Sequence, residues 1–498
     1  MEPRFHIPGA QSGPLTFEDF DQFAKASAIT STYETNPLLM SGMTALRPEN
    51  LESLVRKVVD TQDKFRVYKT LPKERTRSAV NEYTIQVSIG GQVGGTFGRE
   101  LAALRSQVGS YKRRVTYIKQ QYTMASIGHF SSVQRTLENM RALENVNAVT
   151  RLLRDANWSI FFGDEQVAPL QFNGIETILR QERPNHIIDM STITTSNDPR
   201  TYMEAWMDTA RSIGARISNQ GIFGELTHVF SDPLMEAFLQ KFLDPTYRIM
   251  LDNNPTTIAY GSAVPRLRIG NEVVTNMYDI YIPNADSAMP QEAFDADEGG
   301  NTRVDANSPG APTLAVASPV NPNSRFDAAK AGTYIFRVAA ISESGEEGFL
   351  SAPVTHAVAT GDVVEFTITP NADRRQTGYA LYVTTRNPTG TPTLKDYRLI
   401  RRIPATNPGS ADPTVYTWNL EDIPGSSRSF FLNVNPQSIS YLTLFPTQSI
   451  PLYATGATGL GQFWAVAMYT ALQVSIPQHH FVVKNILPPE MKASWKPF

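Results

Sequence analysis

The chain has 498 residues, with 45 basic and 48 acidic side chains and a formal net charge of −3. Proteins whose main task is to bind nucleic acid are usually strongly basic, so this balance argues against a general DNA-binding role. The sequence contains no cysteine, which excludes disulfides, thiolate nucleophiles and cysteine-ligated metal sites. At about 100–200 residues per domain, the length predicts two to four domains.

Long apolar segments are missing from the sequence. No apolar run follows the start of the chain at Met1–Arg4, so we expect no signal peptide. The most apolar stretch, Phe463–Leu472, has about half the length that a bilayer span requires. These features predict a soluble, intracellular protein that makes no membrane contact.

Residues 1–64 contain two segments with helical spacing. Thr16–Ala28 carries acidic residues in its first turn, which favours a helix start, and Pro48–Asp63 repeats leucine and valine every three or four residues. The stretch Tyr33–Pro37 interrupts any continuous helix between them. Two short helices joined by irregular chain predict an N-terminal arm rather than a domain.

The segment after this arm alternates polar and apolar side chains, as strands do. We expect strands at Phe65–Tyr68, Tyr83–Ile89 and Arg114–Lys119, with the glycine-rich run Gly90–Gly98 between the last two. From Arg66 to Lys119 the chain has eleven basic and three acidic residues. The pattern predicts a long, basic excursion that leaves the fold and returns to it.

Ser131–Phe161 has the most regular helical pattern of the chain. Apolar residues recur mostly every three or four positions from Val133 to Leu153, a serine can cap the start, and Gly163 lies just beyond the end. Helices in compact domains average about three turns. A helix this long therefore fits a rod that braces an extended subunit.

The next region, residues 164–285, predicts mixed α/β structure. Helical patterns cover Arg200–Ala215 and Asp232–Phe242, and two short strands are expected between Leu267 and Ile282. Residues 286–309 are acidic and rich in small side chains, which is typical of a linker. We interpret their carboxylates as a solvated spacer, because a linker does not hold two carboxylates at a fixed catalytic separation.

Residues 310–425 predict a separate all-β block. Strand-like runs are punctuated by proline, glycine, asparagine and aspartate at the spacing of a β-sandwich. The seven runs are Thr313–Ala317, Thr333–Ile341, Val354–Val358, Val363–Ile368, Tyr379–Thr385, Tyr397–Ile403 and Val415–Leu420. Residues 426–498 return to an apolar α/β pattern, so one host fold is predicted to be interrupted by an inserted sandwich.

No catalytic, cofactor or metal motif emerges. Gly90–Gly98 matches neither G-x-G-x-x-G nor G-x-x-x-x-G-K-[ST], so a bent loop is the simpler interpretation. His479 and His480 are adjacent, and neighbouring residues on a strand point to opposite faces. The serine-hydrolase motif G-x-S-x-G is also missing. These observations favour a protein without catalytic, cofactor or metal residues.

Several segments together carry a resemblance to a known family. They are Tyr83–Gly91 with Gly95–Leu101, Ser110–Lys112 leading to Thr123–Ser126, Ser131–Phe161, Phe162–Asp164 with Phe172–Ile175, and Ala471–Ile486. In this order they resemble the major capsid protein of tailed bacteriophages, whose fold encapsulin shells share. The resemblance implies an α+β fold with an N-terminal arm (1–64), a peripheral domain (65–185) with an extended loop (84–120) and spine helix (131–161), an axial domain (186–285) and a return segment (426–498).

The inserted block has a resemblance of its own. Tyr334–Ile341, Val363–Thr367 and Thr377–Tyr382 resemble bacterial immunoglobulin-like or fibronectin type III-like modules. Such modules decorate the surface of some phage capsids. The resemblance implies that the block projects outward, stabilises the shell, or makes weak contacts with host surfaces or glycans.

The capsid resemblance implies a structural, non-enzymatic subunit that assembles into hexamers and pentamers around double-stranded DNA. It further implies scaffold, portal and cement proteins as partners, and a virion capsid assembled in the host cytoplasm. The expected subunit-interface residues are Gly90, Gly91, Gly94, Gly95, Phe97, Arg99, Glu100, Arg105, Lys112, Arg113 and Arg114. Lys112 is the only lysine between positions 85 and 118 and lies towards the return strand, so we expect no lysine cross-link through the loop.

Other interpretations remain open. The basic excursion could bind nucleic acid or form a solvated face, although we favour charge pairing with a neighbouring subunit. The whole chain could form an encapsulin-like compartment around a cargo enzyme. It could also be an enzyme, or a carbohydrate-binding or adhesion protein whose sandwich is an accessory module.

Overall fold

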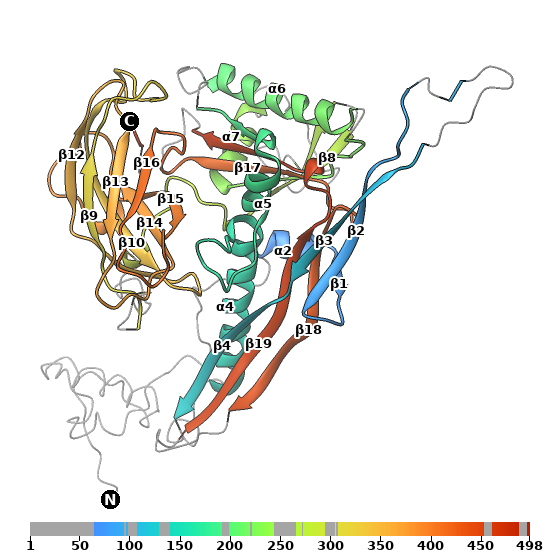
Figure 1. Cartoon of the computed structure of the whole chain (residues 1–498), viewed down its shortest axis with the longest axis horizontal. Helices are drawn as coiled ribbons and strands as arrows, with labels where there is room; N and C mark the ends of the chain where they lie inside the picture. Colours follow the sequence, from blue (N-terminus) through green and yellow to red (C-terminus); the bar gives the residue numbers. More distant parts are fainter. Residues whose placement is uncertain are drawn as a thin grey trace, which may run out of the picture. The chain divides into compact units, whose positions relative to one another are not determined.

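The computed structural model describes residues 64–93, 96–97, 107–128, 140–191, 199–219, 222–243, 265–270, 272–293, 304, 307–452, 461–487 and 496–498. The arm helices expected at Thr16–Ala28 and Pro48–Asp63 lie outside these residues. The described chain has a mixed α+β fold in which a long helix is combined with several sheets (Figure 1).

A four-stranded sheet contains the two longest strands. β18 (Ile439–Leu452) and β19 (Gly461–Val474) form an antiparallel pair of 14 residues each. β4 (Lys119–Gly128) pairs with β19 along its whole length, and β1 (Lys73–Arg75) adds a short parallel edge to β18. The resulting strand order is β1–β18–β19–β4.

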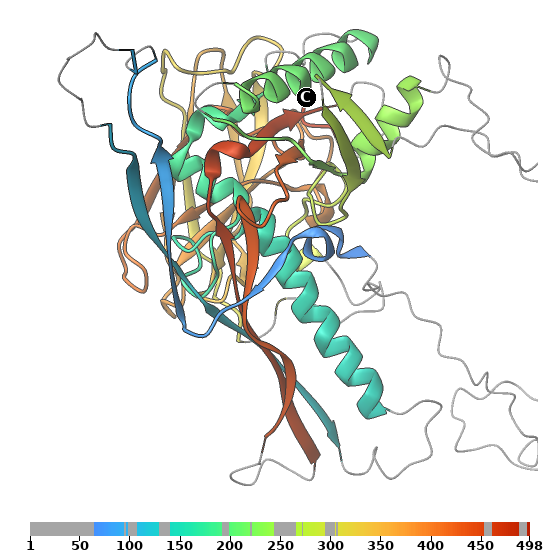
Figure 2. The ribbon, with the colours of Figure 1, turned by 90° about the vertical axis from the view of Figure 1, so that its right-hand side faces the viewer.

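The long helix α4 (Met140–Phe162) lies along this sheet (Figure 2). At 1.5 Å per residue its 23 residues extend about 34 Å. One buried cluster joins the helix to β4 and β19: Ala125, Ile127, Ala148, Leu152, Ala156, Trp464, Val466 and Met468. The predicted spine helix is therefore confirmed from Met140 onward, and residues 131–139 lie outside the described part.

A six-stranded sheet forms a second part of the host fold. Its strands, in spatial order, are β5 (Ile187–Asp189), β20 (Phe481–Ile486), β17 (Ser427–Leu432), β6 (His228–Ser231), β8 (Glu272–Tyr278) and β7 (Arg266–Ile269). The helices α6 (Pro199–Ile217) and α7 (Pro233–Leu243) confirm two sequence predictions, as do β7 and β8.

This sheet is buried on both faces. One face packs against α6 and α7 through residues such as Val229 and Phe431. The other face packs against α4 and α5 (Ile175–Glu182) through residues such as Phe230 and Phe430. The sheet therefore joins the cores on its two sides.

The block after residue 310 forms two facing antiparallel sheets around one core. β10 (Gly332–Ile341), β11 (Glu347–Leu350), β12 (Val354–Val358), β14 (Gly378–Val383) and β15 (Arg398–Pro404) form one sheet, and β9 (Thr313–Ala317), β13 (Val364–Thr369) and β16 (Thr414–Trp418) form the other. The seven predicted strands are all found, and β11 is additional. The shared core contains Phe336, Phe366 and Trp418. The relationship to immunoglobulin or fibronectin modules stays a prediction.

The strand expected at Phe65–Tyr68 is wrong. These residues lead into the helix α2 (Arg66–Thr70), whose Val67 is buried one helical turn before the buried Leu71. Both side chains belong to the core around the end of α4. A two-residue alternation and a single helical turn cannot be distinguished over so short a segment.

The solvated spacer expected over residues 286–309 is wrong for its first part. Ala288 and Ala293 are buried, and the short 3₁₀ helix Gln291–Ala293 packs on the sandwich. The Ala288 carbonyl accepts a hydrogen bond from the Leu399 amide at 3.0 Å, and Glu292 accepts one from the Leu350 amide at 2.7 Å. This stretch is therefore part of a packed interface.

Two glycines set how closely α5 approaches the end of α4. Gly174 donates its amide to the Gly163 carbonyl at 2.8 Å, and an added Cβ at Gly174 would lie 2.6 Å from the Ser159 carbonyl oxygen. Gly174 has φ −81°, a backbone conformation that any residue can adopt. An alanine there would therefore add a steric clash but no backbone strain.

We predict that Gly174→Ala lowers the free energy of unfolding by about 1–3 kcal/mol, because the backbone of α4 must move to admit the methyl group. Gly310→Ala is the matched control, since the nearest atoms to its Cβ belong to the side chain of Asn371, whose displacement breaks a side-chain hydrogen bond but moves no helix backbone. Urea unfolding of both variants measures the difference. Equal stability of the two variants would contradict the close packing at Gly174.

Candidate subunit-interface site

A two-stranded ribbon leaves the host fold. β2 (Val80–Ser88) and β3 (Ser110–Tyr117) pair in antiparallel register from Val80↔Tyr117 to Gln86↔Tyr111 (Figure 1). Among the described strands, none pairs with the outer edge of either one. An isolated pair of strands is marginally stable in water, and its free edges are templates for further pairing.

One face of the ribbon is exposed along its whole length. Directly opposite residues of an antiparallel pair share a face, so this face carries Val80, Glu82, Thr84, Gln86, Tyr111, Arg113, Val115 and Tyr117. Four of these eight are large apolar or aromatic side chains. A gathering of exposed apolar side chains marks an interaction surface.

The opposite face is anchored to the host fold near the base of the ribbon. The Asn81 side-chain amide donates a hydrogen bond to the Gln473 side chain at 2.6 Å, and the Arg114 guanidinium donates one to Glu182 of α5 at 2.7 Å. The Arg114 side chain is only 18% exposed. These contacts fix one end of the ribbon and leave the other end projecting.

Glycine is required where the chain turns out of β2. Gly90 and Gly91 have φ values of 78° and 79°, a conformation that side-chain-bearing residues rarely adopt. A Cβ on Gly90 would also overlap the Val108 carbonyl of the returning chain. Beyond these glycines the tip exposes further apolar side chains, including Phe97, which is 89% exposed.

The predicted interface residues divide into three groups. Gly90, Gly91, Phe97 and Lys112 lie on the ribbon or its tip, and Phe97 and Lys112 are exposed. Arg113 and Arg114 form ion pairs with Glu82 and Glu182 of the same chain, and their pairing with a neighbouring subunit stays a prediction. The remaining residues lie outside the described part: Gly94, Gly95, Arg99, Glu100 and Arg105.

The sandwich is docked on the loop that follows α4, which the sequence did not reveal. Val167 of this loop shares a buried cluster with Ala339, Ile341 and Ala380 of the five-stranded sheet. The Val167 carbonyl accepts a hydrogen bond from the buried Thr377 hydroxyl at 2.8 Å. Part of the outer face of this sheet, at β10 and β14, is therefore buried against the host fold.

Two carboxylates add polar contacts between the sandwich and β5 or β20. Asp189 of β5 pairs with Arg325 and accepts a hydrogen bond from Asn485 at 2.7 Å. Asp422 accepts a hydrogen bond from Lys484 of β20 at 3.1 Å. Both carboxylates are well placed to be held in the charged form.

Burial alone would raise the pKa of both carboxyl groups. For Asp189, hydrogen bonds from Asn485, Ser191 and Arg325 outweigh burial and hold the pKa below its usual value. For Asp422, the positive charges of Lys484, Arg428 and Arg401 have the same effect on the pKa. The docked state therefore binds protons less readily at these positions than the unfolded chain does.

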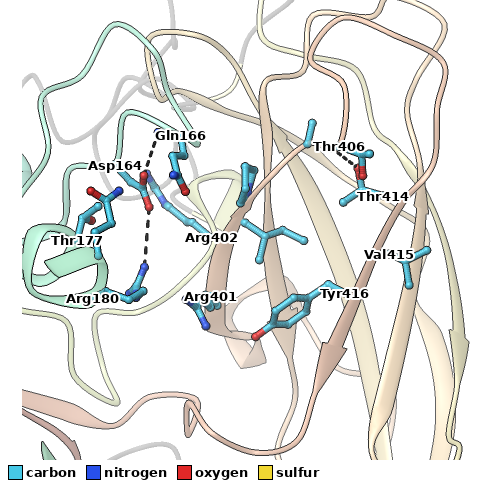
Figure 3. Close-up of a pocket in the computed structure, with 14 residues that line it drawn as sticks. Asp164, Gln166, Thr177, Arg180, Arg401, Arg402, Thr406, Thr414, Val415 and Tyr416 are labelled. Atoms are coloured by element: carbon cyan, nitrogen blue, oxygen red, sulfur yellow. Dashed lines mark hydrogen bonds and ion pairs between the residues drawn. The ribbon is translucent and has the colours of Figure 1, made fainter. Parts of the chain in front are cut away.

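A cavity of about 510 Å³ lies between α5 and the strands β15 and β16 (Figure 3). Three arginines reach its wall, and each has a carboxylate partner. Arg180 contacts Glu176 at 2.8 Å, Arg402 contacts Glu347 at 2.5 Å, and Arg401 contacts Asp422 at 3.6 Å. The arginine charges are compensated, so the cavity is not built to attract an anion.

In the part of the chain that the structure describes, no three metal-ligating side chains gather at one point. None of the helices among the same residues combines the length and the apolar composition of a membrane span. The buried pair His479 and His480 contacts Ser438 rather than a shared ion position. Burial lowers the pKa of His480 to about 3, so this imidazole is neutral at physiological pH.

By sequence, no protein-family model and no curated protein matches the chain. By structure, it is similar to the capsid of a native GTA particle, at 8% identity and a TM-score of 0.43 over 91% of this chain and 100% of that one. It is also similar to the capsid of the cyanophage P-SCSP1u (9% identity, TM-score 0.42, 89% and 94% covered). A third similar structure is the holo-SrpI encapsulin complex from Synechococcus elongatus PCC 7942 (6% identity, TM-score 0.37, 90% and 96% covered).

Acid should weaken the docking of the sandwich. A carboxyl group whose pKa is lowered by folding adds stability above its unfolded pKa, and this stability is lost as the pH falls through the folded value. We predict that the melting midpoint falls as the pH drops from about 4 towards 2, because the loss begins near the ordinary carboxyl pKa and continues down to the lowered pKa of the folded state. Asp189→Asn should reduce the size of this fall.

Differential scanning calorimetry across this pH range measures the effect. Asp208→Asn is the matched control, because Asp208 of α6 is exposed and its ion pair with Arg211 is a surface pair that adds little stability. A fall of the same size in the wild type and Asp189→Asn would contradict the role of Asp189.

Proposed function

We propose that this chain is the structural subunit of an icosahedral capsid and assembles into hexamers and pentamers. The β2–β3 ribbon is the observation that carries the proposal. It exposes two free strand edges and a face on which half of the side chains are large and apolar or aromatic, and no described segment of its own chain covers them. A neighbouring copy that covers this face would bury the exposed apolar side chains and cover the free strand edges. Repeated head-to-tail contacts of this kind close into rings.

The host fold supports the same proposal. The 23-residue helix α4 and the 14-residue strands β18 and β19 form a long, braced element on which a projecting ribbon can be held at a fixed angle. The net charge of −3 limits repulsion between many copies of the chain. It also suits a container that holds double-stranded DNA without binding it tightly.

The cellular setting belongs to the proposal as well. We infer a non-enzymatic component of the virion capsid that assembles in the host cytoplasm, with scaffold, portal and cement proteins as partners. An encapsulin-like compartment would use the same subunit contacts but enclose a cargo protein. The contents of purified particles, nucleic acid or protein, distinguish the two.

We propose that the sandwich stabilises the subunit by packing on the surface of the host fold. Residues 307–425 are all described, and every tyrosine and tryptophan in this segment is buried or half-buried. The sandwich therefore lacks the exposed tyrosine or tryptophan ring on which a carbohydrate site would stack a sugar. The extensive docking through Val167 and Thr377 favours a stabilising role over an adhesive one.

Velocity sedimentation of the wild-type chain at neutral pH, with electron microscopy of the fast fraction, tests the proposal. We expect rings, caps or closed shells. A chain that stays monomeric, even when it is co-expressed with the products of the neighbouring genes, would contradict it.

A charge on the exposed face of the ribbon should block assembly without unfolding the subunit. We predict that Val80→Lys raises the lowest concentration that supports assembly at least about tenfold, because a charged ammonium group would be buried in the contact. Val80 lies opposite Tyr117, so the new charge meets no like charge across the ribbon. Val415→Lys is the matched control, a strand valine exposed on the sandwich: Val80 is 41% exposed and Val415 is 58% exposed. Equal assembly of the two variants would count against the ribbon as the interface.

A further inference from the structure

Phe223, in the turn between α6 and β6, has an unusual backbone conformation. Its φ is 53°, in the left-handed region where a side chain crowds the backbone and where bulky residues are rarely found. Its side chain is 73% exposed. Burial among the described residues of its own chain therefore does not compensate for the strain.

The other non-glycine residues with positive φ have simpler explanations. Leu420 is buried in the sandwich core. Asn485 and Asn387 are asparagines, which tolerate this region, and both use their side chains in hydrogen bonds. Arg374 lies in an exposed turn with a polar side chain. Within the described residues, Phe223 is the one case in which a strained position presents a large apolar side chain to solvent.

The backbone around Phe223 is held on three sides. The Phe223 amide donates to the Asn219 carbonyl at 3.2 Å, and the Gly224 amide donates to the Ile217 carbonyl at 3.0 Å. On the other side, His479 Nε2 donates to the Ile222 carbonyl at 2.9 Å. These bonds hold the turn in the strained conformation, and the exposed side chain is consequently carried by a fixed backbone.

We propose that Phe223 is an anchor residue that inserts into an apolar site on a neighbouring copy of this chain. Strained backbone persists where the structure uses it, and preorganised aromatic side chains commonly dominate the energy of protein interfaces. The inference rests on the proposed shell function, which places an identical neighbour beside every subunit. It adds a second contact, on the six-stranded-sheet part of the fold, to the contact assigned to the ribbon.

The cysteine-free chain allows a direct test by thiol labelling. Phe223→Cys is mixed as a minor component with wild-type chain, so that assembly depends on the wild type. We expect maleimide labelling at this position to slow at least about tenfold in particles relative to free subunits, because a covered site is labelled only when it opens. Val320→Cys, at a sandwich residue that is 83% exposed, is the control and should react at the same rate in both states.

A second variant separates anchoring from folding. Asparagine fits the left-handed region better than phenylalanine, so Phe223→Asn should leave the melting midpoint of the free subunit unchanged or raise it by about 1–3 °C. The same variant should raise the lowest concentration that supports assembly at least about tenfold. If Phe223 served only to stabilise the fold, its replacement would instead lower the melting midpoint of the free subunit.

The outcomes are distinguishable. If the wild type forms no particles, the proposed function fails. If the wild type assembles, the inference alone is overturned by unslowed labelling of Phe223→Cys or by unchanged assembly of Phe223→Asn. A lowered melting midpoint of Phe223→Asn, or protection that requires a different protein of the particle, also overturns it.

Discussion

The burial of the C-terminal half of α4 is the constraint on which the rest of this structure depends. Ala156 packs against the four-stranded sheet, and Phe161 packs against the six-stranded sheet and α5. Asn157, fully buried, accepts a hydrogen bond from the Tyr68 amide and donates to Asp279 at 3.0 Å. Trp158 lies beneath the Arg402 guanidinium of the sandwich. One helix end thus fixes both host sheets and supports the docked sandwich.

The sequence predicted most of the elements because their burial follows a simple period. α4, α6 and α7 each bury one face, and β2 and β3 alternate, so the helical and strand patterns are visible. β19 was missed because its C-terminal half is buried on both faces and reads as an apolar run. The docking of the sandwich was missed although β14, Gly378–Val383, is buried at every position. The apolar sequence of β14 was the available signal that both faces of the five-stranded sheet are covered at this strand.

The candidate site was predicted only in part, for a physical reason. Gly90 and Gly91 stand out in the sequence because a turn with positive φ needs glycine. The identity of the exposed face could not be predicted, because it depends on the register that sets Val115 opposite Glu82. The intrachain partner of Arg114 is Glu182, 68 residues away, and such a pair has no local signature. Phe223 likewise looks like an ordinary loop residue until its φ is known.

The subunit has packed cores on both faces of its six-stranded sheet, and its ribbon exposes two unpaired strand edges. The most direct test of the central claim is hydrogen–deuterium exchange of the ribbon amides, 80–88 and 110–117, in free subunits and in assembled particles. The account predicts fast exchange in the free subunit and strong protection after assembly, because a neighbouring copy covers the ribbon. Equal exchange in both states, with particles present, would contradict the assignment of the ribbon as the subunit interface.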